Sequence, residues 1–467
     1  MTQVTSPYLQ IKEANLIDNS ITEFEYVEYL PRDSNNMNKF GLQIFETRDD
    51  DVFLLPHKAY LEIRGKLQTT ANANYHDDDV ISLVNNGWSL FQTAQYQLNN
   101  QTIENINLYL PQASTMLNLV TFSDDYSRST ASNMLWYKDT GSGLVSLKRN
   151  FPVIAGDSNA ATVRAGVIDM IETYNSNQRA NFGFSARQNI TTGNKQITLM
   201  LPLSQIFGFC RDIDKVFRGV KHSLIVDREI ANNYIMRANG VAAGTFNINH
   251  ISLWMPKVKP SLKIESEINS QLLKGHIKQL YFEQMRVYRT MYQPTETNMT
   301  WRITTQPGTE LPRHVFVAFQ SSERDDNQEM NNMVFDNANL RRISCRINST
   351  QYPEREFECN FSPQNRNYSR LYMSFLDAVN KYQDTDTGCQ LSAEDWASLY
   401  PIHHFDVSKH NDRLKNSSAD IEIRFSLGGN FRNIANNADQ PFYVYAVVLS
   451  DRFFQLEGLS GRMNVII

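Results

Sequence analysis

The tripeptide Asp-Thr-Gly occurs twice in the chain, beginning at Asp139 and at Asp386. Two such aspartates, one from each half of a protein, can share a single proton between their carboxyl groups. One carboxylate then acts as a general base on a water molecule while the other acts as a general acid, and this combination can hydrolyse a peptide bond. The pair is the strongest catalytic motif in the sequence, and its surroundings decide whether it can be used.

The residues that precede each aspartate argue against this chemistry. A proton-sharing pair needs each aspartate at the end of a buried strand, so apolar residues should come directly before it. Instead a Tyr-Lys pair precedes Asp139 and an Asp-Thr pair precedes Asp386. The additional carboxylate of Asp384 favours solvent exposure and repels its neighbour. We therefore interpret both motifs as equivalent surface turns, a domain-sized distance apart, and not as an aspartic protease site.

The other groups that could bind a cation lack the spacing that a metal site needs. The run His-Asp-Asp-Asp at His76–Asp79 has no spaced calcium ligands, so we expect a solvated loop. His403, His404 and His410 are close in sequence, but no cysteine or carboxylate follows them at zinc-type spacing. The sequence therefore predicts no metal ligands.

The cysteines and the remaining motifs give no sign of an enzyme. Cys210, Cys345, Cys359 and Cys389 have no metal-type spacing, and the first twenty residues lack the pattern of a secretory signal, so we expect free thiols. The sequence has no Ser-His-Asp signature, no glycine-rich phosphate loop and no nucleophile elbow. We therefore predict a protein that is not an enzyme, with no catalytic residues, no cofactor-binding residues and no cofactor.

Length and composition narrow the class of protein. The chain has 467 residues, of which 41% are hydrophobic and 11% aromatic, and its net charge is −5. This length favours two domains, and the aromatic content favours sheets over helices. No basic tail is present that could neutralise phosphates, so specific nucleic-acid binding is not indicated. No apolar run is long enough to predict a membrane span.

Most segments with a clear hydrophobic period are predicted to be strands. Residues Ala59–Leu67, Ile343–Ile347 and Asp420–Leu427 alternate between apolar and polar side chains, which is typical of half-buried strands. Residues Tyr443–Leu449 are apolar throughout, which indicates a strand buried on both faces.

Three helices are expected between these strands. The first lies in the segment Pro260–Gly275, the second spans roughly Ser369 to Tyr382, and the third begins at Ser392, with Asp395 completing a capping box. The position of the first helix near the middle of the chain makes it a candidate connector between domains.

Six pairs of sequence phrases recur in the same order in the two halves of the chain. The separation between the members of a pair shrinks along the chain and never grows, which indicates a tandem of two similar β domains. The pairs are LPHKAYLEI and LPRHVFVAF, AQYQLNNQT and SCRINSTQ, YKDTG and DTDTG, LPLSQIF and YPIHHF, HSLIV and DIEIRF, and HISLW and YAVVL.

The shrinking separation locates an insertion in the first half. The interval from Asp139 to Pro202 is much longer than the interval from Asp386 to Pro401, so we expect a long insertion at about 141–198. We expect it to rise as a tower that the first domain does not need for folding and that helps to hold an oligomer. Its apolar residues would otherwise be exposed: Phe151, Val153, Ile154, Val163, Val167, Ile168, Met170 and Ile171.

These observations predict an all-β fold of two tandem, similar β domains with a few short helices. We expect an N-terminal arm at 1–20, a first domain at 21–258, a connector helix at 259–276 and a second domain at 277–467.

The wording of the strand phrases also resembles a known family. The phrases FEYVEYLP, PHKAYLEIRGKL, NNGWSLFQTAQYQLNNQTI, LWYKDT, FGFCRDIDKVFRGVKHSL, LPRHVFVAFQ, DIEIRFS and GRMNVI resemble the double jelly-roll major capsid protein, or hexon, of Polinton/Maverick elements and adintovirus-like double-stranded DNA viruses. The resemblance runs from about Ile21 to Ile467, and it depends on the number and order of the phrases because none of them is a catalytic motif.

The resemblance implies that the two domains are tandem jelly-roll β-sandwich domains, a double jelly roll, with the first jelly roll at 21–258 and the second at 277–467. It also implies a homotrimeric, pseudo-hexagonal capsomer that tiles an icosahedral shell around a double-stranded DNA genome. Its expected partners are further copies of itself, neighbouring capsomers, and penton and minor capsid proteins. The expected location is the virion capsid, made and assembled inside the host cell. A glycan- or receptor-binding β-sandwich protein is the alternative, although it gives no reason for a duplicated domain with a long insertion.

Overall fold

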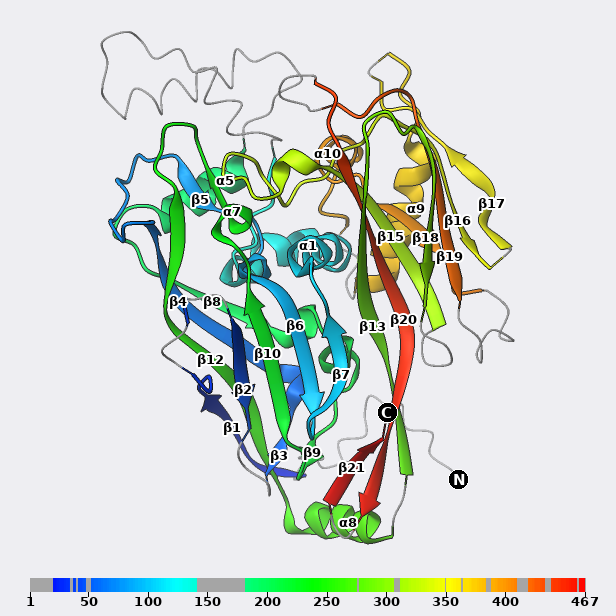
Figure 1. Cartoon of the computed structure of the whole chain (residues 1–467). Coiled ribbons are helices and arrows are strands. Elements are labelled where there is room, and N and C mark those ends of the chain that lie inside the picture. Colours follow the sequence, from blue (N-terminus) through cyan, green and yellow to red (C-terminus); the bar gives the residue numbers. More distant parts are fainter. Residues whose placement is uncertain are drawn as a thin grey trace, which may run out of the picture.

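The computed structural model shows two β-rich halves side by side, the first at the left of Figure 1 and the second at the right. It describes residues 20–33, 37–38, 41–47, 52–140, 181–274, 277–305, 311–348, 350–362, 364–383, 388–409, 419–432, 438–459 and 462–466.

The first half contains two large sheets. The β12 sheet has the order β8 (Ile197–Pro202), β4 (Tyr60–Thr69), β12 (Gly244–Pro260), β3 (Phe53–Leu54) and β9 (Phe217–Arg218), and β1 (Ile21–Tyr29) also pairs with β12. The β10 sheet has the order β2 (Leu42–Glu46), β10 (His222–Arg228), β6 (Phe91–Leu98) and β7 (Gln101–Ile106). A small two-stranded sheet joins β5 (Ile81–Leu83) to β11 (Ile235–Arg237).

The second half contains two sheets of the same kind. The β20 sheet has the order β13 (Ile277–Tyr292), β20 (Phe442–Leu459), β15 (Leu311–Ser321) and β18 (His403–Asp406), and β21 (Arg462–Ile466) pairs with β20. The β19 sheet has the order β14 (Asn298–Thr304), β19 (Asp420–Leu427), β16 (Leu340–Ile347) and β17 (Thr350–Glu358). The strands of these sheets are paired antiparallel throughout.

The strand orders match between the halves. The path β8-β4-β12-β1 corresponds to β18-β15-β20-β13, and the path β2-β10-β6-β7 corresponds to β14-β19-β16-β17. Five of the six repeated sequence phrases fall on or beside corresponding strands; for example, LPHKAYLEI leads into β4 while LPRHVFVAF forms β15. The sixth pair cannot be compared, since Asp386 lies outside the described residues.

The helices lie mostly around the sheets and between the halves. Their bounds are α1 (Leu110–Thr121), α2 (Asp124–Arg128), α5 (Phe182–Thr191), α6 (Gly208–Asp212), α7 (Ala231–Tyr234), α8 (Leu262–Leu273), α9 (Ser369–Tyr382) and α10 (Ala393–Leu399). Short 3-10 turns occur at Pro56–Lys58, Gly87–Leu90, Thr130–Met134, Leu203–Gln205 and Ser322–Arg324. None of the helices in the described ranges is both long and apolar enough to cross a membrane.

The three helices expected from the sequence are confirmed. α8 lies within the predicted segment, α9 has the predicted bounds, and the Ser392 side chain accepts the backbone N–H of Asp395 at the start of α10. The apolar run at Tyr443–Leu449 is also confirmed as a strand buried on both faces, since all residues from Val444 to Leu449 are buried and β20 lies between β13 and β15 in its sheet. The buried side chains of both halves form one continuous core.

Candidate functional site

The first Asp-Thr-Gly motif lies inside the protein, which corrects the prediction of a surface turn. Asp139 is 1% exposed, and the Arg187 side chain on α5 donates to its Oδ1 at 2.6 Å. Neither side chain of this ion pair contacts solvent. The residues before Asp139 suggested exposure, but Arg187 supplies the counter-charge that makes burial of a carboxylate possible.

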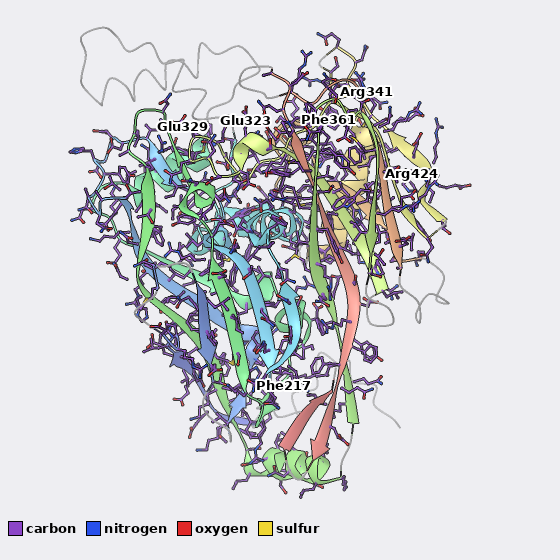
Figure 2. All side chains as sticks on the ribbon, viewed as in Figure 1. Phe217, Glu323, Glu329, Arg341, Phe361 and Arg424 are labelled. Carbon is purple, nitrogen blue, oxygen red and sulfur yellow. The ribbon has the colours of Figure 1, made fainter. Side chains whose placement is uncertain are left out.

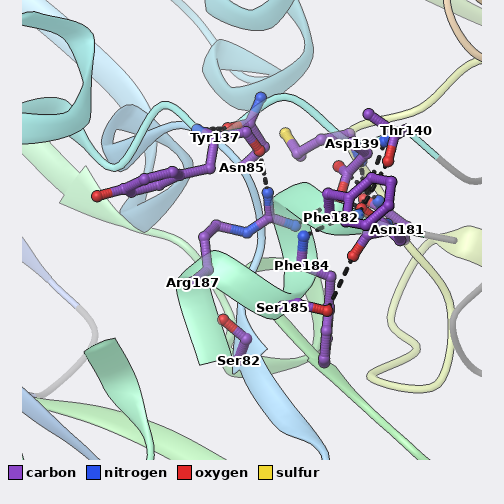
Figure 3. Close-up of polar contacts among 12 residues, drawn as sticks. Ser82, Asn85, Tyr137, Asp139, Thr140, Asn181, Phe182, Phe184, Ser185 and Arg187 are labelled. Atoms are coloured by element: carbon purple, nitrogen blue, oxygen red, sulfur yellow. Dashed lines mark hydrogen bonds and ion pairs between the residues drawn. The ribbon is translucent and has the colours of Figure 1, made fainter. Parts of the chain in front are cut away.

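Each of the three guanidinium nitrogens of Arg187 donates a hydrogen bond at this site. Its Nε donates to the carbonyl of Leu83 at 3.0 Å, and its Nη1 donates to the carbonyl of Tyr137. Asn181 donates from Nδ2 to Asp139 Oδ1 at 2.8 Å and caps α5 by accepting the N–H of Phe184. Figure 3 shows these side chains converging from α5 and from the segment that ends at Thr140. The motif therefore anchors α5 to the first half.

The second half completes the same network. The Asn331 side chain donates from Nδ2 to Asp139 Oδ2 at 2.9 Å, and its backbone carbonyl accepts a hydrogen bond from Arg324 at 3.0 Å. Arg324 in turn forms a buried ion pair with Asp336 at 2.8 Å. Asn331 thus joins two buried Arg–Asp pairs, one from each half, into a single polar network that we call the junction network.

The junction network does not have the chemistry of a hydrolase. Asp139 has its two carboxylate oxygens occupied by Arg187, Asn181 and Asn331, so neither oxygen is available to activate a water molecule. A proton-sharing dyad also needs a second carboxylate in contact. The distance expected between the two motif aspartates is untested, because Asp386 lies outside the described residues. What the arrangement can do is hold α5, the first half and the second half together.

A second buried carboxylate lies at the same junction. Glu104 on β7 is completely buried and accepts three backbone N–H groups, from Gly208 at 3.2 Å, Phe209 at 3.1 Å and Met285 at 3.3 Å. Burial raises the pKa of Glu104 to about 7, although these hydrogen bonds act in the opposite direction. Glu104 therefore joins β7 and α6 of the first half to β13 of the second.

Gly208 permits this close contact between the halves. A Cβ atom at position 208 would lie 1.8 Å from the carbonyl oxygen of Glu283 on β13. Backbone cannot move aside as a flexible side chain could, so any larger residue would push α6 away from β13.

The candidate metal residues occupy other places. His76, Asp77 and Asp78 are exposed, as expected for a solvated loop. His403 and His404 are buried, and burial lowers the pKa of His403 to about 3, while His410 lies outside the described residues. Within the ranges that the structure describes, no group of three or more potential ligands is arranged to hold a metal ion.

His404 instead belongs to a hydrogen-bonded chain that the sequence did not indicate. Its Nδ1 donates to the carbonyl of Ser374 at 2.8 Å, which leaves Nε2 to accept from Nδ1 of His314 at 2.9 Å. Lys381 then donates to Nε2 of His314. Burial and the neighbouring His404 lower the pKa of His314 to about 3, so the chain consists of neutral imidazoles that connect β15, β18 and α9.

The four cysteines are free thiols in the structure. Cys210, Cys345 and Cys359 are buried, whereas Cys389 is partly exposed. Burial raises the pKa of Cys345 to about 12, so its thiol stays protonated and unreactive near neutral pH.

Comparison with known proteins identifies the family to which this geometry belongs. Residues 160–454 match the model of the double jelly roll-like domain family. A chain of the Sputnik virophage, solved by cryo-electron microscopy, superposes with a TM-score of 0.57 at 12% identity, covering 100% of this chain and 93% of that one.

Two further solved structures have the same fold. The mavirus major capsid protein has a TM-score of 0.51 at 10% identity, covering 100% of this chain and 96% of its own. The Faustovirus major capsid protein has a TM-score of 0.51 at 8% identity, covering 95% and 92%. The search of curated proteins found no match. The expected fold class, two tandem jelly rolls, is confirmed.

Proposed function

The chain belongs to the double jelly roll-like domain family, and we propose that it is a major capsid protein that builds the shell of a virion. The observation that carries this proposal is the extent of the shared fold. Structural similarity to the mavirus major capsid protein extends over both halves and nearly the whole of each chain. The buried interior supports a structural role as well, because the described carboxylates at the junction bind the halves together and leave no catalytic group free.

We further propose that three copies form a pseudo-hexagonal capsomer and that these capsomers tile an icosahedral shell around double-stranded DNA. Two similar sandwiches per chain give six in a trimer, which supports a nearly hexagonal outline. The strand phrases quoted above favour a Polinton/Maverick or adintovirus-like lineage. Penton and minor capsid proteins would be partners, and assembly would take place inside the host cell.

The same proposal divides the chain into functional parts. An arm at 1–20 would precede a first jelly roll at 21–258, a connector helix at 259–276 and a second jelly roll at 277–467. The separation of sheets supports this division, since none of the described strands from β1 to β12 pairs with a strand from β13 onward.

The insertion needs a narrower definition than the sequence suggested. Residues 141–180, with all of the apolar side chains named above for the tower, lie outside the described residues. α5 and β8, however, are integral to the first half, because Arg187 neutralises Asp139 and β8 pairs with β4. We therefore propose that the C-terminal part of the segment 141–198 contributes to folding, and that 141–180 is the part that the first half does not need.

Expression of the full chain tests the proposal directly. Light scattering after size exclusion should give three times the chain mass, and negative-stain images should show particles with a hexagonal outline. A monomer that binds a glycan array would instead support the alternative of a glycan-binding protein.

A deletion tests the part played by the insertion. Replacement of residues 141–180 by a short Gly-Ser linker keeps Asn181 and Arg187, so the variant should remain folded but lose its trimeric mass. Replacement of 141–198 is the matched control, and it should unfold at lower denaturant because Asp139 loses its counter-ion. An unchanged trimer after the shorter deletion would refute the role of the insertion in assembly.

A further inference from the structure

One face of the second half is covered by the first half of the same chain. The N–H of Met285 on β13 donates to Glu104 on β7, and the ring of Tyr445 on β20 packs at 5.8 Å from that of Tyr109. Arg289 on β13 also stacks on Tyr109 at 4.1 Å. The outer face of the β20 sheet is therefore packed against β7 and the start of α1.

The internal repeat identifies the matching face of the first half. Leu61 and Val317 occupy the same place after the repeated Leu-Pro, and Leu61 pairs with Leu253 while Val317 pairs with Ala446. Tyr29 is the partner of Leu253 on the other side, and Tyr288 is the partner of Ala446. β1 therefore corresponds to β13, with Tyr29 matching Tyr288 by the Leu-Pro repeat and Arg286, two positions away on the same face, by the repeat of HISLW and YAVVL.

This register assigns a counterpart to each residue of the internal contact. Three positions earlier on each strand, Tyr26 matches Met285. The hairpins that close with Leu98–Gln101 and Ile347–Thr350 likewise match, which makes Tyr96 equivalent to Cys345. Because Tyr96 pairs with Glu104 and Cys345 pairs with Tyr352, Tyr352 on β17 corresponds to Glu104 on β7.

The matching face of the first half carries partly exposed aromatic side chains. Of the cations that stack on rings in the described chain, only Lys58 lies over one of them, the ring of Phe24. Phe24 and Tyr26 on β1 are 45% and 40% exposed, and their rings form a row with those of Tyr60 and Trp254 at centroid distances between 5.4 and 6.4 Å. We call these four residues the aromatic row. A contiguous aromatic surface of this kind is typical of a protein interface.

The helix α9 and the strand β17, which are the counterparts of α1 and β7, also expose surface that the described chain does not cover. Every residue of α1 from Leu110 to Val120 is buried between the two halves, whereas its counterpart α9 exposes a stripe that includes Arg370, Met373 and Asp377. Half of the residues of β7 are buried, whereas Phe357 is the one buried residue of its counterpart β17. Figure 1 places β1 at the lower left of the molecule and β17 at the upper right, with β7 and β13 between them.

We propose that β17 and α9 of one copy cover the aromatic row of the next copy, repeating between chains the contact that β7 and α1 make with the β20 sheet within the chain. The proposal rests on the proposed capsomer and names its interface. Tyr26 of one copy then lies opposite Tyr352 of its neighbour. Such a contact joins two different surfaces, so it closes into a ring when each copy is rotated by one third of a turn.

The residues at the β17 end suit a polar rim around this contact. Arg370 lies over the ring of Phe357 at 4.8 Å and donates to the carbonyls of Arg355 and Glu356, which joins α9 to β17 as one surface. Arg341 and Arg424 lie on the same side of the second half (Figure 2), where Arg424 pairs with Glu422. Both β17 and β1 carry several glutamates, and those of β1 pair with cations of their own chain. The aromatic row, and not charge complementarity, therefore carries the proposed contact.

Cross-linking between two variants that each carry one introduced, exposed cysteine beside the three buried ones tests the geometry. Tyr26→Cys and Glu354→Cys would be prepared separately in a Cys389→Ser background, mixed, reassembled and treated with a short bismaleimide. The mixture should yield a covalent dimer, whereas each variant alone should not. Cross-linking of either variant with itself would overturn the proposal, because it would show two copies of one surface in contact.

A charge substitution tests the contribution of the row to assembly. Tyr26→Arg should raise the protein concentration at which trimers dissociate by at least about tenfold, while Leu42→Arg, at an exposed apolar residue of β2 (60% exposed), should leave it unchanged. A wild-type protein that is monomeric would refute the capsomer itself. A wild-type trimer that resists Tyr26→Arg and gives no cross-link in the mixture would refute only this interface. Binding of the row to a glycan, lost in Tyr26→Arg without change in oligomer mass, would also overturn it.

Discussion

Asp139 and Glu104 are both buried carboxylates at the junction of the two halves, but different groups stabilise them. Asp139 has a cation in contact, the equally buried guanidinium of Arg187. Glu104 has three backbone N–H donors, while the nearest cation, Arg211, directs its hydrogen bonds to Asp212 and Glu283. Partial charges of amides compensate a buried carboxylate less completely than a full counter-charge does, which is why the pKa of Glu104 rises to about 7.

The difference separates two ways of joining domains. The ion pair of Asp139 and Arg187 fixes α5 and, through Asn331, the second half, and it has no substitute if one member is lost. The cradle around Glu104 depends instead on backbone positions in α6 and β13, which remain in place when the side chain changes. The comparison predicts that substitutions at Asp139 are far more damaging than substitutions at Glu104.

The largest loss of unfolding free energy is expected from Asp139→Ala. This variant leaves the guanidinium of Arg187 buried without a counter-ion, and breaking such a pair typically costs about 3–5 kcal/mol of unfolding free energy. The urea midpoint of unfolding should fall accordingly. Asp77→Ala is the control, since Asp77 is 70% exposed in its pair with Lys195 and should contribute little. Equal urea midpoints for Asp139→Ala and Asp77→Ala would show that the buried pair of Asp139 and Arg187 stabilises the protein no more than the exposed pair of Asp77 and Lys195 does.

The burial of Asp139 could not be predicted from its neighbours in sequence. Its partners Arg187 and Asn331 lie 48 and 192 residues away, and neither belongs to a recognisable motif. The strands were predictable because alternation is a local property, as in the buried Ile421, Ile423 and Phe425 of β19. A site built by tertiary contacts between distant polar residues produces no repeating pattern in the sequence.

The helix α1 shows the same limit. Its sequence places Gln112, Ser114 and Thr115 among apolar residues, so no amphipathic stripe appears, and the helix was not predicted. In the structure all three are buried, because the second half covers the helix and the hydroxyl of Ser114 donates to the carbonyl of Leu110. By contrast, α9 has one covered face and one open face, and its bounds were predicted correctly.

An intermediate change in unfolding free energy, which depends on pH, is expected from Glu104→Gln. The pKa of Glu104 is about 7 in the folded protein against an ordinary value of 4.5, so the folded state holds a proton that the unfolded state releases between these values. The free energy of unfolding should therefore fall by about 3 kcal/mol as the pH rises from 4.5 to 7.

The glutamine variant isolates this contribution. It cannot titrate, so the difference in unfolding free energy between wild type and variant should shift in favour of the variant as the pH rises. The buried histidines act in the opposite direction: the pKa of His314 and that of His403 are lowered to about 3, so they reduce stability as the pH falls below the ordinary histidine value. Because both proteins share these histidines, their effect cancels. A difference that stays constant with pH would show that Glu104 keeps its charge throughout this range.

The smallest loss of unfolding free energy is expected from Tyr400→Phe. Tyr400 is buried, and its hydroxyl oxygen accepts the backbone N–H of Asp139 at 3.2 Å, so it touches the junction network without contacting the carboxylate. The variant leaves one buried N–H without its acceptor, which should cost about 1–2 kcal/mol. A double-mutant cycle with Asp139→Ala sharpens the comparison, because the alanine introduced there keeps the same backbone N–H. If the charge of Asp139 and the hydroxyl of Tyr400 act separately, the two losses should add to within about 0.5 kcal/mol. A loss from Tyr400→Phe that disappears in the Asp139→Ala background would show that the hydroxyl acts by positioning the carboxylate, and the junction network would then be one cooperative unit.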